Sequence, residues 1–406
     1  MLILLLGVVS TVSCAAVASN VVQIPLEIDN SMYTVNSLSL GLPAQSVSKI
    51  VLDTGSSDLV ITHSVYDITK STSAINSNLT FSMQYGSSDL FYVFAVNETL
   101  VGDDFKLSKF PLGYPKDTLI RDIVGYSGIL GLGFRAFEAL FRTSNNGKGV
   151  GYANFPQALK EQGITKSSLF SLNGQSDNPY VIFGGVDTNA YEGPLVKVPI
   201  IFIIGTNFVL DYYLYLDVTV NQVTFNNKED KTVIANQPLA YWMDTGADSW
   251  LTTPAIYKNL YNCFQNTKLE NEITWILIKE LKKISITFNI AGFDVTIPLT
   301  DLIDTKNGDY ASLKIDYATI GTETYQSIIP NAVYKYMYTV FDLDNGFVYL
   351  GKSSGSQRQV IKSVTNAELP VPTTTLKEYT NSYTTLYKDS LETMVASRPT
   401  SCKKKH

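Results

Sequence analysis

Apolar and polar residues alternate with a period of two along most of the chain between residues 22 and 352. This period is typical of β-strands with one buried face, and the runs that show it are rich in β-branched and aromatic residues. They include MYTVNSLSLGL at 32–42, SKIVLDTG at 48–55, LTFSMQYG at 79–86 and KKISITFNIAGFDVTI at 282–297. The pattern predicts an all-β protein.

Helical segments are few and short. FPQALKEQG at 155–163 ends at Gly163, and PAIYKNLYNCF at 254–264 carries a proline in its first turn, where proline is favoured. We therefore expect small accessory helices at these two places. No glycine-rich loop opens a helix, which disfavours nucleotide chemistry.

The first eighteen residues are predicted to be a signal peptide. An apolar run from Leu2 to Val12 is followed by Ala16-Val17-Ala18, an A-x-A cleavage signal. The alternative, a membrane anchor, needs about twenty apolar residues, more than this run supplies. The prediction is a secreted protein of the extracellular space or cell wall, without a membrane span.

Secretion gives meaning to two glycosylation sequons, at Asn78 and Asn97. It also removes Cys14, which leaves Cys263 and Cys402 either as one disulfide or as two free thiols. From residue 353 to residue 406 Ser and Thr dominate and the periodicity fades, which predicts a solvated polar tail.

Composition narrows the function. Hydrophobic residues make up 45 % of the chain, enough for a sizeable core, whereas charged residues make up only 17 %. The net charge of −6 argues against a nucleic-acid partner. Of the two histidines, His406 is the last residue and His63 stands alone, so a Ser-His-Asp enzyme or a histidine-rich metal site is excluded. We expect no metal and no cofactor, and any acid–base chemistry must come from carboxylates.

One motif occurs twice. The apolar run before Asp53 leads into Asp-Thr-Gly, and the run before Asp244 does the same 191 positions later, about the length of one lobe. In both copies a small residue, a polar pair and a second apolar run follow. A single copy reads as a tight surface turn, but the matched pair predicts two equivalent loops in two lobes.

Such loops bring carboxylates together. The residues before each aspartate, including Val51 and Trp242, are expected to bury the strand and fix its end. Gly55 and Gly246 allow a tight turn, while Thr54 and Thr245 can reach across to the opposing loop. Two carboxylates about 3 Å apart share one proton, so one group can activate a water while the other polarises a carbonyl.

These residues resemble the pepsin-like aspartic proteases, in particular the secreted fungal and yeast branch that includes candidapepsins and yapsins. The similarity covers about residues 23–352 and includes GILGLGF at 128–134 and YTVFDLDNGFVYLG at 338–351. It implies a bilobal all-β fold with lobes over 19–196 and 197–352. It also implies endopeptidase activity on peptide or protein substrates, by a monomer.

The resemblance assigns roles to the residues of the motifs. Asp53 and Asp244 are the implied catalytic pair. The implied supporting residues of the two loops are Thr54, Gly55, Ser56, Thr245 and Gly246. FSMQYGSSDL at 81–90 is similar to the flap that closes over the substrate, with Tyr85 and Gly86 in it. The alternative for Tyr85 is the buried face of a hairpin strand.

Several positions depart from the family pattern. Val60 replaces a tryptophan that holds the flap tyrosine, and Ala247 lacks the hydroxyl that Ser56 offers to Asp53. Pro330 replaces a glycine behind the second aspartate, where it is expected to distort the support. No partner for Cys263 follows within the second lobe, and 35 positions between Ala18 and Asp53 leave no room for the usual inhibitory pro-segment.

Two function classes follow. The first is a secreted aspartic endopeptidase, which the two intact Asp-Thr-Gly loops favour. The second is a pseudo-protease that binds peptides without cutting them, which Pro330 and Val60 favour. A third interpretation, an adhesin carried on a polar stalk, is supported by the composition of the tail alone. Cleavage of a peptide substrate distinguishes the first two.

Overall fold

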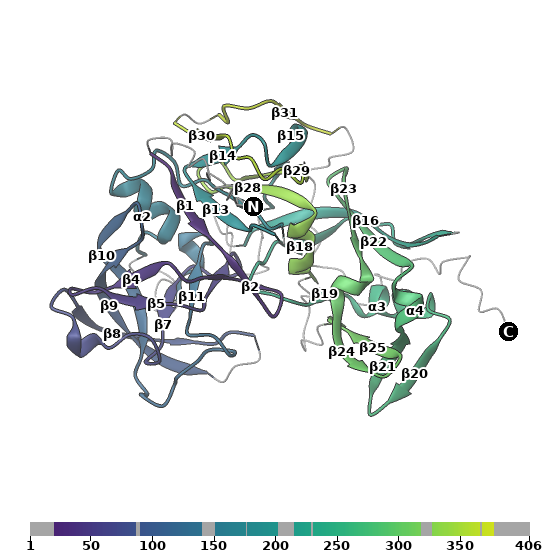
Figure 1. The fold of residues 1–406 in the computed structure, drawn as a ribbon, viewed down its shortest axis with the longest axis horizontal. Coiled ribbons are helices and arrows are strands. Elements are labelled where there is room, and N and C mark those ends of the chain that lie inside the picture. Colours follow the sequence, from purple (N-terminus) through teal and green to yellow (C-terminus); the bar gives the residue numbers. More distant parts are fainter. Residues whose placement is uncertain are drawn as a thin grey trace, which may run out of the picture.

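The computed structural model describes residues 20–86, 90–139, 151–175, 177–201, 215–228, 230–317, 327–365 and 368–376. Within these residues strands dominate, and two β lobes stand side by side beneath a shared sheet (Figure 1). The predicted all-β, bilobal architecture is confirmed.

The first lobe is built on a ten-stranded sheet. Its strands, in spatial order, are β2 (Glu27–Asp29), β3 (Met32–Val35), β6 (Ile50–Asp53), β11 (Gly128–Gly131), β7 (Leu59–Ile61), β10 (Lys106–Pro115), β9 (Phe91–Val101), β4 (Leu38–Leu40) and β5 (Gln45–Val47), and β8 (Ile75–Met83) pairs with β9. β6 lies parallel to β11 in the middle of this sheet, so its end is held on both sides.

The second lobe repeats this arrangement in an eight-stranded sheet. In spatial order it contains β23 (Phe293–Pro298), β22 (Ile284–Ile290), β16 (Asp217–Asn227), β18 (Leu239–Trp242), β27 (Ser327–Ile328), β19 (Trp250–Thr252) and β26 (Ile315–Tyr317), with β17 (Lys231–Ala235) paired to β16. A smaller sheet adds β20 (Thr267–Glu270), β21 (Ile273–Leu277), β25 (Tyr310–Leu313) and β24 (Ile303–Asn307). As β6 does with β11, β18 lies parallel to β27.

A seven-stranded sheet joins the lobes. It runs through β1 (Val22–Pro25), β13 (Tyr180–Phe183), β12 (Phe170–Asn173), β28 (Met337–Asp342), β29 (Phe347–Ser353), β15 (Tyr191–Pro199) and β31 (Thr373–Thr374). β12 comes from the end of the first half of the sequence and β28 from the end of the second half, and these two strands pair directly. The lobe boundary predicted after residue 196 falls inside β15 and therefore inside this shared sheet.

The two predicted helices are confirmed as α2 (Phe155–Glu161) and α3 (Pro254–Asn262). The side chains of Asn154 and Thr253 cap their first turns by accepting a backbone N–H. The other helical turns among the described residues are α4 (Ile278–Leu281), η1 (Ile68–Lys70), η2 (Arg135–Phe137), η4 (Leu299–Leu302) and η5 (Asn331–Lys335). Among the described residues no helix has the length and apolarity needed to cross a membrane.

The described residues after position 353 pack on the body of the protein, which corrects the solvated tail predicted from residue 353 onward. β30 (Ile361–Ser363) pairs with β14 (Gly185–Asp187), and β31 pairs with β15. Val364 is buried, and Leu369 and Val371 pack against the same apolar cluster. These few apolar residues are enough to hold the segment on the body of the protein, although Ser and Thr dominate its composition.

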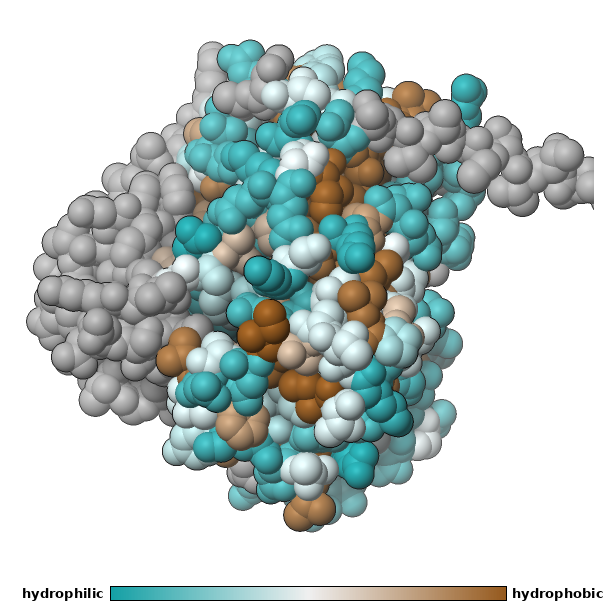
Figure 2. Space-filling model, turned by 90° about the vertical axis from the view of Figure 1, so that its left-hand side faces the viewer, coloured by the Kyte–Doolittle hydropathy of each residue, from teal (hydrophilic) through white to brown (hydrophobic). Residues whose placement is uncertain are grey.

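One apolar core runs through both lobes, and it includes Leu52, Phe170, Tyr241 and Phe288. On the side of the molecule that Figure 2 shows, hydrophobic patches are interrupted by hydrophilic residues, so they form no continuous apolar surface there. Cys263, directly after α3, is disulfide-bonded, which removes the free-thiol alternative for this residue. Cys14 and Cys402 lie outside the described residues.

Candidate active site

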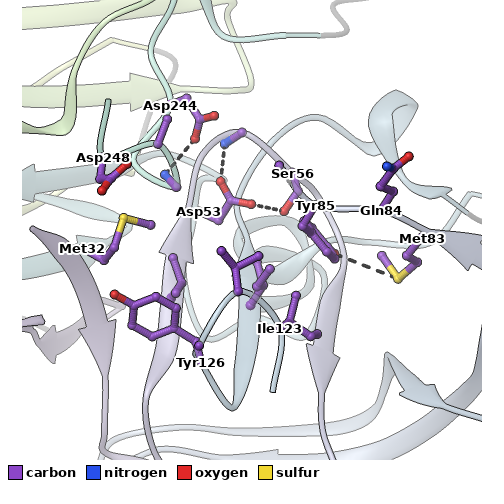
Figure 3. A pocket seen from close by; sticks show the side chains of 18 of the residues that line it. Met32, Asp53, Ser56, Met83, Gln84, Tyr85, Ile123, Tyr126, Asp244 and Asp248 are labelled. Carbon is purple, nitrogen blue, oxygen red and sulfur yellow. Dashed lines mark hydrogen bonds between the residues drawn. The ribbon is translucent and has the colours of Figure 1, made fainter. Parts of the chain in front are cut away.

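The two Asp-Thr-Gly loops meet at the bottom of the cleft between the lobes. Asp53 ends β6 and Asp244 follows β18, and both side chains are largely buried. Each aspartate accepts a backbone N–H from the glycine two residues later, over 2.8 Å from Gly55 and 2.7 Å from Gly246. The structure therefore brings together the two carboxyl groups that the repeated motif predicted (Figure 3).

Each glycine also lies against the aspartate of the other loop. A Cβ atom placed on Gly55 would be 2.3 Å from Cγ of Asp244, and one placed on Gly246 would be 2.3 Å from Oδ1 of Asp53. No side chain fits in either place. Glycine is required here because the opposite carboxyl group approaches the backbone so closely.

The threonines lock the two loops together. The backbone N–H of Thr54 donates to Oγ1 of Thr245 over 3.0 Å, and the N–H of Thr245 donates to Oγ1 of Thr54 over 2.9 Å. Each hydroxyl in turn donates to a carbonyl of the opposite strand, Thr54 to Met243 and Thr245 to Leu52, over 2.6 Å in both cases. All four hydrogen bonds cross between the lobes, so they fix the relative position of the two aspartates.

A strand behind each loop supports it. In the first lobe Leu132 N donates to the carbonyl of Asp53 over 2.8 Å, and Gly133 N donates to that of Ser56 over 2.7 Å. In the second lobe Ile329 N donates to the carbonyl of Trp242 over 3.0 Å, and Asn331 N donates to that of Ala247 over 3.3 Å. Backbone hydrogen bonds therefore support both loops.

Pro330 lies at the position of the second lobe that corresponds to Gly131 in the first. Each of the two residues comes two positions after a residue that pairs with the strand leading to the aspartate of its lobe. A Cβ on Gly131 would lie 2.5 Å from the backbone nitrogen of Asp58, so a side chain is excluded there. Pro330 is accommodated because the chain turns directly into η5 after it, with φ −65° and ψ 141° at the proline. The sequence predicted that Pro330 would distort the support behind Asp244. The structure shows instead a local change in the path of the chain at the proline.

The carboxyl pair is electrostatically asymmetric. Burial raises the pKa of Asp53, while hydrogen bonds from the Ser56 hydroxyl and the Gly55 N–H lower it. Burial also raises the pKa of Asp244, and the neighbouring charge of Asp53 raises it further, while Ala247 offers no hydroxyl that would lower it. Both effects favour the shared proton on Asp244, and the two carboxyl groups titrate as one unit.

A cavity of about 1020 Å³ extends from the carboxyl pair along the cleft. Tyr85 and Gly86, which were predicted to lie in a flap, line this cavity together with Asp53 and Ser56 (Figure 3). The Tyr85 hydroxyl lies 4.0 Å from the sulfur of Met83, and its ring lies 6.3 Å from that of Phe91. Val60 is completely buried next to this cluster and has no polar group to offer Tyr85.

The glycosylation sequons differ in accessibility. Asn78 lies in an exposed irregular part of β8, with φ 60°. Asn97 is only partly exposed within β9, and Thr99 of the same sequon is buried. Asn78 is the better placed of the two predicted acceptors.

Sequence reasoning assigned Val51 and Trp242 to strand burial. Val51 is buried as expected and Trp242 is only partly buried, and both residues line the cleft. The period of two along each strand carried this signal, since a residue two positions before an aspartate shares its face. Within the described residues, no three His, Cys, Asp or Glu side chains gather where they could hold a metal ion.

A two-lobed β fold with paired Asp-Thr-Gly loops at its cleft defines the aspartic proteases. The family model for eukaryotic aspartyl proteases matches residues 32–353, and the chain belongs to this family. The members of this family are hydrolases, aspartic-type endopeptidases that act on peptide or protein substrates, which is the class that the sequence predicted.

Among known proteins the chain is similar to aspartic proteinase yapsin-3 of Saccharomyces cerevisiae, with 25 % identity over 85 % of this chain and 71 % of the relative. It is 24 % identical to the probable aspartic-type endopeptidase opsB of Aspergillus oryzae, over 81 % of this chain and 70 % of the relative. The crystal structure of an aspartic proteinase from Irpex lacteus matches 85 % of this chain and all of that chain, with a TM-score of 0.66 and 19 % identity. These relatives agree with the predicted fungal and yeast branch.

Proposed function

We propose that the protein cuts peptide bonds under acidic conditions, with Asp53 and Asp244 as its catalytic pair. The observation that carries this proposal is the reciprocal packing of the two loops, in which each glycine lies against the opposite carboxyl group and each threonine hydrogen-bonds the other. This arrangement fixes the carboxyl groups before any substrate binds, which is what acid–base catalysis requires.

The asymmetry of the pair assigns the roles. The ionised carboxylate of Asp53 takes a proton from a water molecule, and the protonated carboxyl of Asp244 donates a hydrogen bond to the scissile carbonyl. The water adds to the carbonyl carbon to give a tetrahedral intermediate. The proton that Asp53 took then passes to the amide nitrogen as the C–N bond breaks, and no covalent enzyme intermediate forms. Thr54, Gly55, Ser56, Thr245 and Gly246 hold the pair, and Tyr85 with Gly86 covers the substrate and excludes water.

The pseudo-protease remains the second candidate because of one observation. The Asn331 N–H donates to the carbonyl of Ala247 over 3.3 Å, whereas Leu132, which matches Asn331 when Pro330 is matched to Gly131, donates to the carbonyl of the aspartate itself over 2.8 Å. Support behind Asp244 is therefore looser than support behind Asp53. A chain with this defect would bind peptides in the cleft without cutting them.

We further propose that the protein is secreted and carries a glycan on Asn78. Three observations support this: the cleavage signal at Ala16-Val17-Ala18, the disulfide at Cys263, and the exposure of Asn78. Disulfides persist in oxidising compartments, so the bonded state of Cys263 agrees with export from the cytosol.

The deciding experiment is digestion of a denatured protein by the full chain, from about pH 3 to about pH 7, the range over which a carboxyl pair titrates. It is run with and without a statine-type transition-state analogue. Cutting that the analogue blocks and that both Asp53→Asn and Asp244→Asn lack establishes the enzyme. Folded protein that binds the analogue and leaves the substrate intact establishes the pseudo-protease instead.

A further inference from the structure

The two lobes place equivalent residue pairs beside their aspartates. In the first lobe Val51 and Ile129 are partners across β6 and β11, two residues before Asp53 and Gly131. In the second lobe Trp242 and Ile328 are partners across β18 and β27, in the same parallel pairing. All four side chains line the cleft. The isopropyl group beside Asp53 therefore corresponds to an indole beside Asp244.

The indole points to the cleft side of its strand. Tyr241 and Met243, on either side of it in the sequence, are completely buried in the core, whereas Trp242 is only partly buried. Since successive side chains of a strand point to opposite faces, Trp242 shares its face with Asp244. It therefore occupies space that a substrate side chain next to Asp244 would need.

Two aromatic rings keep the indole in place. The ring of Phe137 lies 5.7 Å from that of Trp242 at an interplanar angle of 79°, and the ring of Tyr215 lies 4.6 Å away at 60°. Phe137 and Tyr215 also contact each other, at 4.7 Å and 65°. Edge-to-face contacts of this kind are favourable beyond the area they bury, so the indole has a fixed position.

Phe137 comes from the first lobe and is itself anchored. Ala139 N donates to Oδ2 of Asp58 over 3.0 Å, and Tyr152 N donates to Oε2 of Glu138 over 2.9 Å. These hydrogen bonds hold the segment that carries Phe137, which lines the cleft opposite Trp242. The indole is thus clamped between the lobes and cannot turn away when a substrate enters.

The half of the cleft beside Asp53 is built differently. Besides Val51 and Ile129, the side chains of Met83, Ile123 and Tyr126 line the cavity there and belong to one apolar cluster under the flap. This half offers apolar walls without an indole next to the carboxylate. The two halves of the cleft therefore differ in the space that they leave beside the reacting bond.

We propose that Trp242 determines specificity by limiting the size of the substrate side chain that lies next to Asp244. The expected substrates carry a bulky apolar residue on one side of the scissile bond and a small residue, Gly, Ala or Ser, on the other. This inference rests on the proposed function, since it concerns the substrate of the same cleft.

The test replaces Trp242 with valine, the residue that the first lobe has at the equivalent position. Peptide pairs that differ only in Ala or Phe on each side of a cut bond are compared on the wild type, Trp242→Val and the intermediate Trp242→Phe. The wild type should prefer Ala on one side, and Trp242→Val should shift the Phe-to-Ala ratio of kcat/KM at that side alone by at least about tenfold. Trp275→Phe, on β21 and outside the cleft lining, is the matched control and should leave both ratios unchanged.

A binding measurement separates this inference from the proposed function. The same peptide pairs are titrated calorimetrically against Asp53→Asn with and without Trp242→Val, and thermal unfolding confirms that each variant is folded. If no peptide is cut but the ratio of Kd values still depends on Trp242, the catalytic proposal is overturned and the specificity proposal stands. Ratios that stay within twofold in both assays, or a wild type that accepts Phe equally on both sides, overturn the role of Trp242.

Discussion

Thr54 and Thr245 are bound to each other by a closed pair of hydrogen bonds, in which the N–H of each residue donates to the hydroxyl oxygen of the other over 3.0 and 2.9 Å. Both residues are almost fully buried. The carboxyl groups of Asp53 and Asp244 lie one residue away from this contact. The distance between the lobes at the reacting centre is therefore set by two side chains that do not take part in the chemistry.

Replacing one of these threonines should destabilise the protein. Thr245→Val keeps the shape but removes the acceptor for Thr54 N and the donor to Leu52 O, which leaves buried polar groups unpaired. We expect a loss of about 2 to 5 kcal/mol in the free energy of unfolding, measured by urea denaturation. Thr245→Ser retains the hydroxyl and should lose less than half as much. Equal losses for Val and Ser would contradict a role for the hydroxyl.

Gly55→Ala should remove activity while the protein stays folded. The new methyl group would lie 2.3 Å from Cγ of Asp244 and must displace that carboxyl group. A displacement of about 1 Å in a catalytic group lowers the rate by about a hundredfold, which a fluorogenic peptide assay detects. Gly193→Ala, with φ 71° and no atom within 4 Å of the added carbon, is the control, because it strains the backbone without touching the site. Its activity per folded molecule should equal that of the wild type.

Ala247→Ser should move the alkaline limb of the pH–rate profile to lower pH. Burial and the charge of Asp53 raise the pKa of Asp244, and Ala247 offers no hydrogen bond that would lower it. Ser56 supplies such a bond to Asp53. A serine at 247 would stabilise the ionised form of Asp244, so the shared proton leaves at lower pH. An unchanged profile of kcat against pH would show that the hydroxyl does not reach the carboxyl group.

Glu138→Gln should stabilise the protein at neutral pH. Burial raises the pKa of Glu138 to about 9, and Oε1 of this side chain has no hydrogen-bond partner. The folded state thus keeps a proton that the unfolded chain releases above about pH 4.3, so stability falls as the pH rises from about 4.3 to about 9. Glutamine does not titrate, and the variant should gain about 3 to 4 kcal/mol at pH 7 and nothing at pH 4.

Urea unfolding at both pH values measures this difference. The control is Glu161→Gln, since Glu161 is 60 % exposed in its ion pair with Arg135. Its stability should change by less than about 1 kcal/mol at either pH. A gain for Glu138→Gln that is the same at pH 4 and pH 7 would show that the buried proton is not its cause.

Pro330→Gly should leave catalysis nearly unchanged. The Ile329 N–H already binds the carbonyl of Trp242 over 3.0 Å, and the backbone of Pro330 is unstrained at φ −65°. Glycine would add conformational freedom to the unfolded chain and lower the stability by about 0.4 to 1 kcal/mol. The measurements are kcat, KM and the unfolding midpoint. An increase of kcat by more than tenfold would instead identify the proline as the defect of a pseudo-protease.

Local patterns were sufficient for much of this protein. The period of two predicted the strands, Gly163 and the first-turn proline at position 254 marked α2 and α3, and the repeated Asp-Thr-Gly predicted two equivalent loops. These features depend on neighbours within a few residues, or on a repeat that can be seen without a fold. The ordered segment up to residue 376 was missed because its few apolar residues gain a partner only from β14 and β15.

The sequence by itself determined the all-β class, the pair of carboxylates and the glycines that their approach requires. Only the tertiary structure decided how the two loops differ and what flanks them. Trp242 reads as a core residue along the chain, and it lines the cleft because β18 turns the face of Asp244 toward the first lobe, where Phe137 meets it. A residue's neighbours across a cleft come from distant parts of the chain, so the local alternation that predicts a strand does not reveal them.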